Sequence, residues 1–226
     1  MTFWKKWLPP AKELPLYVKE YRESFTVSPP RNTPVDELRF VVFDTETSGL
    51  DPKQARLLSL GAVVVQGGTL HVHQSLEMTA YAPQTKVHEH VAIHGLTQRE
   101  LQAGESEAYI LENWLAFIRR AVLVAHHAAF DMAVMNRLCK QHYGIKLKNQ
   151  TLDTAYLAKR LEHGTQLNEY IRPEEYSLDL LCERYDIRPD DRHTAAGDAF
   201  ITAKLLLKLL AKARQSGITT LGELVR

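Results

Sequence analysis

The chain has 226 residues, of which 45% are hydrophobic and 24% are charged, so it is a globular chain with enough residues for one large domain. Its 28 basic and 27 acidic residues give a formal net charge of +1, and no overall basic surface points to a long nucleic acid as the partner. A protein that contacts only a few nucleotides remains compatible with this charge, because it needs few phosphate contacts.

The expected location follows from the cysteines and the N-terminal residues. Cys139 and Cys182 form no CxxC pair and are too few to cross-link a chain of this size, which is typical of reduced thiols in a cytoplasm. Residues 1–15 carry charges and prolines where a signal peptide needs an apolar run of about 7 to 15 residues. No apolar stretch reaches about 18 residues. We therefore expect a cytoplasmic protein without a membrane span.

Residues 1–35 are predicted to form an N-terminal arm, and residues 36–226 the domain itself. Prolines open the arm, a helix is one interpretation of residues 11–25, and SPPRNTP closes the arm as a loop. Tryptophans beside lysines at residues 4–7 suggest contact with a partner or a membrane surface. The alternative, that the arm packs back on the domain, is favoured because the segment is short and its charges are mixed.

The first part of the domain has the pattern of an antiparallel meander. Residues 38–44, LRFVVFD, form an apolar run typical of a strand that is buried on both faces, and residues 56–66 predict a second strand. Gly67 and Gly68 predict a tight hairpin turn into a third strand at residues 69–78.

Helical and strand patterns alternate in the rest of the chain. Short strands are predicted at residues 121–126 and at the start of NQTLDTAYLAKRL, which continues as a helix. Three antiparallel strands followed by this alternation predict an α/β domain, with a mixed sheet of five strands flanked by helices. The other predicted helices cover residues 106–120, 130–143, 177–187 and 193–214.

Two carboxylates stand at the end of the first predicted strand. Asp44 and Glu46 are separated by one residue, so their side chains point to the same face if the extended backbone continues that far. Carboxylates held this close repel each other, and a divalent cation such as Mg²⁺ would stabilise them. The alternative is that one acid caps the turn that follows while the other is solvated.

Two further acids occupy comparable positions. Asp131 follows the strand of residues 121–126 at the start of a helix, and Asp198 lies in the first turn or so of the closing helix. Each acid alone is also explained as a first-turn residue that complements the helix dipole. His193 precedes Asp198 by five residues, which corresponds to about 140° around a continuous helix, so the two side chains could not share a helix face. His193 is therefore expected at or before the helix start. A histidine beside several carboxylates is a candidate general base.

Three segments in this order resemble the motifs of a known enzyme family. FDTETSGL, AHHAAFD and HTAAGDA are similar to the three exonuclease motifs of the DEDDh branch of the DnaQ-like 3'-5' exonucleases, the superfamily of the DNA polymerase III epsilon subunit and ribonuclease T. IHGLT and LDTAYLAKR resemble two further family segments. The resemblance covers about residues 38–213 and implies a ribonuclease H-like fold, which agrees with the mixed sheet predicted above.

The resemblance also implies a catalytic mechanism. In the family, four acids hold two divalent cations, Mg²⁺ or Mn²⁺, which activate a water molecule and stabilise the leaving 3'-oxygen. A histidine takes the proton from that water. The implied product is a nucleoside 5'-monophosphate released from the 3' end of single-stranded DNA or RNA. The residues that match these catalytic and metal-binding positions are Asp44, Glu46, Asp131, His193 and Asp198.

Residues near the terminal nucleotide are assigned by the same resemblance. Thr45, His94, Leu96 and Phe130 are expected there, with Phe130 either stacking on a base or packing in the core. The chain departs from the family at His127, where asparagine is common. The other histidines raise the possibility of zinc, but no cysteine or acid accompanies them at structural-zinc spacing.

Two classes of function follow. The first is an active exonuclease, with proofreading or DNA repair as the leading role and RNA trimming as the alternative. The second is a noncatalytic accessory module that binds nucleic acid, although such a module has no need for a general base. The sequence contains no polymerase segment, so a polymerase or repair protein would be a separate partner.

Overall fold

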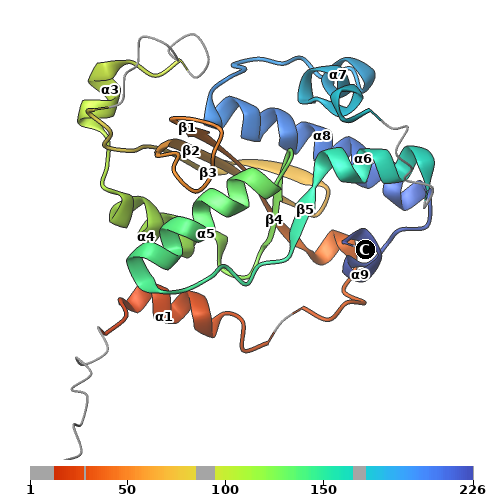
Figure 1. The fold of residues 1–226 in the computed structure, drawn as a ribbon. Helices are drawn as coiled ribbons and strands as arrows, with labels where there is room; N and C mark the ends of the chain where they lie inside the picture. The colour runs from red at the N-terminus through yellow and green to blue at the C-terminus, as the bar shows by residue number, and fades with distance from the viewer. Residues whose placement is uncertain (1–12, 28, 85–94, 165–171, 226) are drawn as a thin grey trace, which may run out of the picture.

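A computed structural model of the chain describes residues 13–27, 29–84, 95–164 and 172–225. A five-stranded sheet in the order β3-β2-β1-β4-β5 forms its centre (Figure 1). The first three strands pair antiparallel, whereas β4 pairs with β1 and β5 with β4 in parallel. The predicted mixed sheet is therefore confirmed. The strands are β1 (Arg39–Thr47), β2 (Leu57–Gln66), β3 (Thr69–Thr79), β4 (Val122–Ala125) and β5 (Thr151–Asp153).

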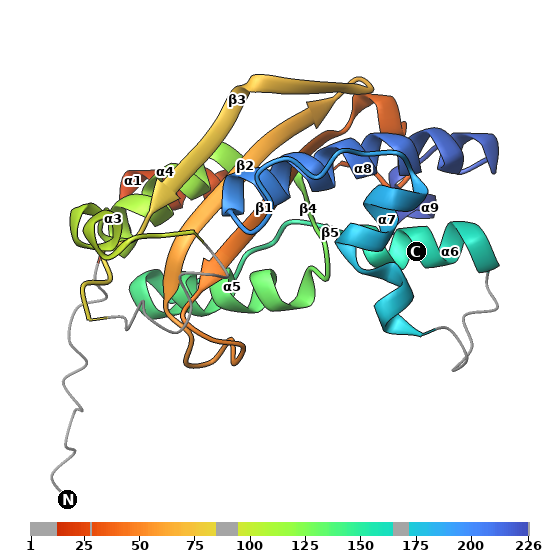
Figure 2. The same ribbon diagram turned by 90° about the horizontal axis from the view of Figure 1, so that it is seen from above.

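Helices cover both faces of the sheet (Figures 1 and 2). No helix in the described ranges is long and apolar enough to cross a membrane. Short 3-10 turns occupy Val35–Glu37 and Pro173–Tyr176. The helices are α1 (Leu16–Glu23), α3 (Gln98–Ala103), α4 (Glu107–Ile118), α5 (Ala129–Tyr143), α6 (Thr154–His163), α7 (Leu178–Arg184), α8 (Ala195–Gln215) and α9 (Leu221–Leu224).

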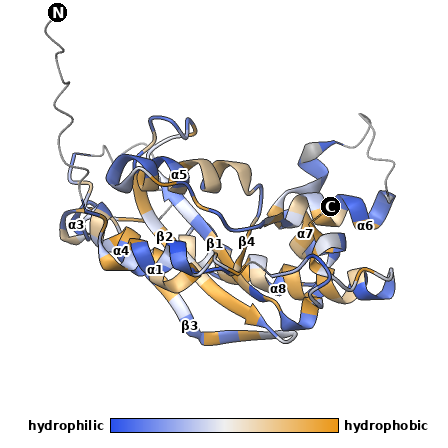
Figure 3. Cartoon of the chain, turned by 90° about the horizontal axis from the view of Figure 1, so that it is seen from below, coloured by the Kyte–Doolittle hydropathy of each residue, from blue (hydrophilic) through white to orange (hydrophobic). Residues whose placement is uncertain are grey.

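Alternation along β1 separates two hydrophobic cores. Val41 and Phe43 face α4 and α5 and pack with the fully buried Trp114. Phe40 and Val42 face the opposite way, into the core made with α6, α7 and α8. Figure 3 shows the hydrophobic residues concentrated on the strands and on the helix sides that face them. A sheet covered on both faces explains why β1 and β2 are almost continuously apolar.

Helix α1 lies against α4 and contributes Val18 and Tyr21 to the core. The Tyr21 hydroxyl donates a 2.7 Å hydrogen bond to Asn149 Oδ1 and accepts one of 2.8 Å from the Lys148 backbone N–H. The described part of the predicted arm is thus packed on the domain.

Candidate active site

The two acids of β1 lie on the face that points to α8. The predicted strand ends at Asp44, but the observed strand continues to Thr47, so the extended backbone includes Glu46. Asp44 lies opposite Gly61 of β2, and Glu46 lies opposite Ser59. Both carboxylates are partly buried and share one face, as the two-residue spacing predicts.

Gly61 allows α8 to approach this face closely. A Cβ atom at Gly61 would lie 2.3 Å from the Ala195 carbonyl group and 2.3 Å from Ala196 N, which no side chain can tolerate. The first turn of α8 therefore rests directly on β2, next to Asp44. The helix starts there because the Thr194 hydroxyl, as N-cap, accepts a 3.0 Å hydrogen bond from Gly197 N.

This approach brings Asp198 to the two acids of β1. Ligand oxygens of Asp44, Glu46 and Asp198 all lie within 4.8 Å of one another, and we call these three residues the carboxylate cluster. Asp198 is 8% exposed. The fourth predicted acid, Asp131, lies in the first turn of α5 and accepts hydrogen bonds from the Thr45 N–H (3.0 Å) and hydroxyl (2.6 Å).

Burial and mutual repulsion change the ionisation of these acids. The pKa of Asp44 is raised well above its ordinary value by burial and then by the charges of Asp131, Glu46 and Asp198. Burial and the charges of Asp198 and Asp131 raise the pKa of Glu46 to about 7. Burial also raises the pKa of Asp131 to about 6, against the two hydrogen bonds from Thr45. The site thus concentrates more negative charge than its own residues neutralise.

The basic side chain of Arg192 contacts the carboxylate cluster directly. Its guanidinium group donates to Asp198 Oδ1 and makes two bonds to Asp179 of α7, of 2.6 Å and 3.1 Å. We call this arrangement of Arg192, Asp179 and Asp198 the Arg192 clamp. It joins α7 to the first turn of α8 and fixes the backbone immediately before His193.

His193 lies outside α8, as its spacing from Asp198 predicts. The helix begins at Ala195, and His193 is exposed with a left-handed backbone (φ 63°). Asp191 is also left-handed (φ 56°), and its carbonyl oxygen is so close to Gly197 that a Cβ there would lie 2.0 Å away. Two left-handed residues and this close packing hold the turn that presents His193.

Two residues that the sequence did not identify as positioning groups lie beside the motifs. His126 Nε2 donates to the Tyr176 carbonyl (3.0 Å), and Nδ1 is 2.8 Å from the Thr154 hydroxyl. Burial and the neighbouring His127 lower the pKa of His126 to about 4. Asp153 caps α6 through Oδ1 and accepts from Ala128 N (2.9 Å) through Oδ2, which fixes the turn before Asp131.

The residues predicted to contact the nucleotide differ in their burial and surroundings. Thr45 is buried, and its hydroxyl is engaged with Asp131. Leu96 packs beside Leu58 and Leu101. Phe130 is partly buried against the core, whereas His94 lies outside the described residues. His127, which replaces the common asparagine, has φ 58°. Asparagine and histidine both tolerate this left-handed conformation better than most residues, so the replacement preserves the turn.

The carboxylate cluster fits hard divalent cations. Its donors are all carboxylate oxygens, which Mg²⁺ and Mn²⁺ prefer, and none is a cysteine or histidine of the kind that selects zinc. The raised pKa values of Asp44 and Glu46 indicate that an additional positive charge would stabilise their ionised forms.

Comparison with solved structures agrees with this fold. Escherichia coli exonuclease I in complex with a dT13 oligonucleotide has a TM-score of 0.62 and 16% identity, covering 80% of this chain and 43% of that one. Product-bound exonuclease I has a TM-score of 0.62 and 18% identity, covering 80% and 45%. The fold is ribonuclease H-like, as expected.

The sequence relatives carry names that refer to DNA polymerase III. The PolC-type DNA polymerase III of Thermotoga maritima is 32% identical over 186 residues, 82% of this chain and 13% of that protein. The DNA polymerase III subunit epsilon-like protein of Rhodobacter capsulatus is 33% identical over 193 residues, 84% of this chain and 26% of that protein. The subunit epsilon of Aquifex aeolicus is 28% identical over 172 residues, 76% and 80% of the two chains. This chain therefore spans only a small part of the first two relatives.

A family model covers most of the domain. The RNase T-type model, described as exonuclease, matches residues 41–206 and includes every acid described above as well as His193. The chain therefore belongs to the DnaQ-like exonuclease family.

Proposed function

We propose that the chain is a divalent-cation-dependent 3'-5' exonuclease that releases nucleoside 5'-monophosphates from single-stranded nucleic acid, with DNA as the leading substrate and RNA as the alternative. The observation that carries this proposal is the carboxylate cluster, whose three ligand groups converge within 4.8 Å in a chain of an exonuclease family. The carboxylates come from β1 and α8, two elements that Gly61 brings into contact.

The acids divide between two cation positions in this proposal. The carboxylate cluster would hold one cation, and Asp44 and Asp131 would hold a second. When bound, these cations would activate the attacking water and stabilise charge on the leaving oxygen. Thr45 orients Asp131 through its two hydrogen bonds, so we assign Thr45 a positioning role in addition to any contact with substrate.

His193 takes the proton from the attacking water. The residue is exposed and precedes α8, so its ring is free to reach a nucleotide over the cluster. The Arg192 clamp holds the adjoining backbone, and the helix cap at Thr194 fixes the other side. An imidazole ring is a common general base in proton transfers of this kind.

The names of the relatives support the proposed substrate and partner. The matched regions belong to proteins named as DNA polymerase III, and a solved neighbour is named as a complex with a dT13 oligonucleotide. We therefore favour a proofreading or repair role, in the cytoplasm and together with a polymerase or a repair protein. In this proposal residues 36–226 carry the nuclease and residues 1–35 form an appended arm, of which α1 is braced against α4.

The first test is a digestion time course. DNA and RNA single strands of one sequence, labelled at the 5' end, are incubated with Mg²⁺ or Mn²⁺. We expect labelled products shortened stepwise from the 3' end, none in EDTA, and none with Asp44→Asn. Asp36→Asn, which removes an exposed carboxylate outside the site, is the control and should retain the wild-type rate. Absence of cleavage with both strands and both cations would instead favour the noncatalytic module.

The role of His193 is tested separately. His193→Gln should lose about 100-fold or more in turnover, while Mn²⁺ binding measured by calorimetry stays unchanged. A variant with the wild-type rate and pH profile would assign the base to another residue.

A further inference from the structure

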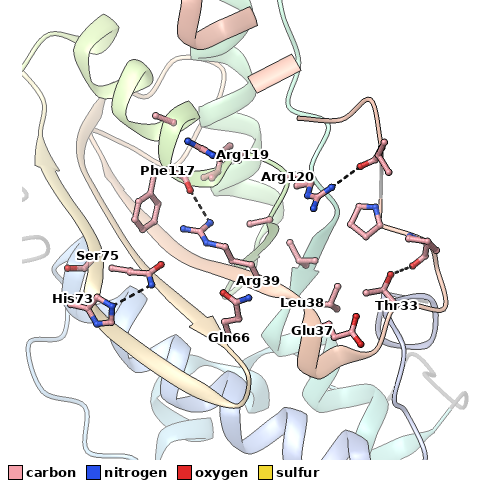
Figure 4. Close-up of a pocket in the computed structure, with 18 residues that line it drawn as sticks. Thr33, Glu37, Leu38, Arg39, Gln66, His73, Ser75, Phe117, Arg119 and Arg120 are labelled. Atoms are coloured by element: carbon pink, nitrogen blue, oxygen red, sulfur yellow. Dashed lines mark hydrogen bonds between the residues drawn. The ribbon is translucent and has the colours of Figure 1, made fainter. Parts of the chain in front are cut away.

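A large cavity lies beside Arg39, the first residue of β1 (Figure 4). Asp44 and Glu46 of the carboxylate cluster lie toward the other end of this strand. The cavity volume is about 890 Å³, within the range of small-ligand sites. Its walls come from the segment before β1, the turn between α4 and β4, and the edge strand β3. Arg39 begins β1, five residues before Asp44 and seven before Glu46, so roughly 17 to 23 Å of strand separates the cavity from these acids.

The walls of this cavity carry excess positive charge. Three arginines, Arg39, Arg119 and Arg120, line it together with a single carboxylate, Glu37, which gives a formal net charge of +2. No ion pair among the described residues joins any of these arginines to a carboxylate. Burial and the charge of Arg119 lower the pKa of Arg39. The excess of positive charge in the cavity walls contrasts with the formal net charge of the whole chain, which is only +1.

Neutral groups hold the arginines in place. Arg39 Nη1 donates a 2.9 Å hydrogen bond to the Phe117 carbonyl oxygen, and its guanidinium carbon lies 5.3 Å from the centre of the Phe117 ring. Arg120 Nη1 donates to the Val27 carbonyl (3.2 Å). A guanidinium group has five N–H donors, so these contacts fix its position and leave donors and charge for an anion.

The turn that carries Arg119 is rigid and strained. Arg119 has φ 40° and ψ −125°, a conformation that residues other than glycine rarely adopt. Buried Asn149 holds the turn by donating hydrogen bonds to the carbonyl oxygens of Arg119 (2.8 Å) and Ala121 (2.7 Å). The Tyr21 hydroxyl donates to Asn149 Oδ1 and so fixes the Asn149 side chain. Strain of this kind persists where surrounding contacts determine the conformation, and it is concentrated at functional sites.

We propose that this cavity is a second ligand site, distinct from the nuclease centre, that binds a phosphomonoester. A terminal phosphate carries about −1.5 to −2 charges at pH 7, which matches the net charge of the walls, whereas one carboxylate or one phosphodiester carries only about half of this charge. The planar guanidinium groups match phosphate oxygens through paired hydrogen bonds. The ligand is a free nucleoside 5'-monophosphate or the 5'-phosphorylated end of a nucleic acid strand, and both present the same group to the arginines.

Calorimetric titration of the full chain in metal-free buffer tests this site. The probes are thymidine 5'-monophosphate, a 5'-phosphorylated oligothymidylate, the same oligomer with a 5'-hydroxyl group, and a glutamate-rich peptide. We expect at least one phosphorylated probe to bind about tenfold or more tightly than the hydroxyl oligomer and the peptide. Tighter binding of the monophosphate would identify a free nucleotide as the ligand, and tighter binding of the phosphorylated oligomer would identify a strand end.

Matched variants locate the binding. Arg119→Gln and Arg120→Gln should each lower the affinity for the phosphorylated probe about tenfold. Both residues are exposed, so the variants should still fold. Arg56→Gln removes the same charge from an exposed residue at the acid end of the sheet and should change nothing. Equal binding of the hydroxyl oligomer or the peptide would overturn the proposal, as would unchanged affinity in both cavity variants or an equal loss in Arg56→Gln.

Discussion

Replacing Gly61 by alanine tests whether the close approach of α8 builds the candidate site. The added Cβ would lie 2.3 Å from backbone atoms of Ala195 and Ala196, whereas ordinary contacts begin near 3.4 Å, so the start of α8 must retreat by about 1 Å. No side chain can rotate to relieve these contacts, because all three partners are backbone atoms. Asp198 lies in the first turn of the helix and would move with it, away from Asp44.

The expected effect is large on catalysis and moderate on stability. A displacement of about 1 Å in a catalytic group can reduce the rate roughly 100-fold, and overpacking typically lowers the free energy of unfolding by about 1–3 kcal/mol. The assay measures turnover on labelled single-stranded DNA, Mn²⁺ affinity by calorimetry and unfolding in urea. Gly49→Ala is the control, because its Cβ meets nothing within 4 Å. A folded Gly61→Ala protein with wild-type turnover and Mn²⁺ affinity would refute the reasoning.

Three further predictions concern the charges and the buried hydrogen bonds. Arg192→Ala removes the positive charge that Asp179 and Asp198 share. The melting temperature in metal-free buffer should therefore fall by several degrees and recover largely with Mn²⁺. A melting temperature equal to wild type would contradict a structural role for Arg192. The pKa of Glu46 is raised from 4.5 to about 7, so the folded state binds the extra proton, and stability in metal-free buffer should fall as pH rises across this interval. Urea unfolding at several pH values measures how the free energy of unfolding changes with pH. Glu46→Gln should reduce this pH dependence, and an unchanged pH dependence would mean that another group causes it. Tyr21→Phe removes the donor to Asn149 and leaves Lys148 N without its acceptor, so urea unfolding should show a loss of about 1–3 kcal/mol at unchanged turnover per folded molecule; a much smaller loss would mean that water replaces the hydroxyl.

The sheet and the β1 acids were predictable because both depend on local periodicity. Continuous apolar runs identified β1 and β2, and Gly67 and Gly68 identified the hairpin between β2 and β3. The two-residue spacing of Asp44 and Glu46 placed them on one face without knowledge of the fold. The position of His193 before α8 followed from helical geometry alone.

Features that depend on distant residues were not predictable in this way. Asp179 and Arg192 are thirteen residues apart on separate elements, and nothing local indicates that one guanidinium group joins α7 to α8. The basic cavity combines segments that are far apart in the chain, and Arg39 lies 80 residues before the adjacent pair Arg119 and Arg120. Helix α3, which was not among the predicted helices, does carry a local signal, the capping box between Thr97 and Glu100.

The alternation of β1 also constrains how this domain can vary. Thr45 faces α5 and holds Asp131, whereas its two neighbours Asp44 and Glu46 face α8. Inserting or deleting one residue between Arg39 and Asp44 would exchange these directions, sending the acids toward α5 and the threonine toward α8. Changes in the length of this strand are therefore compatible with the site only in steps of two residues, whereas the loop after Thr47 is free of this restriction.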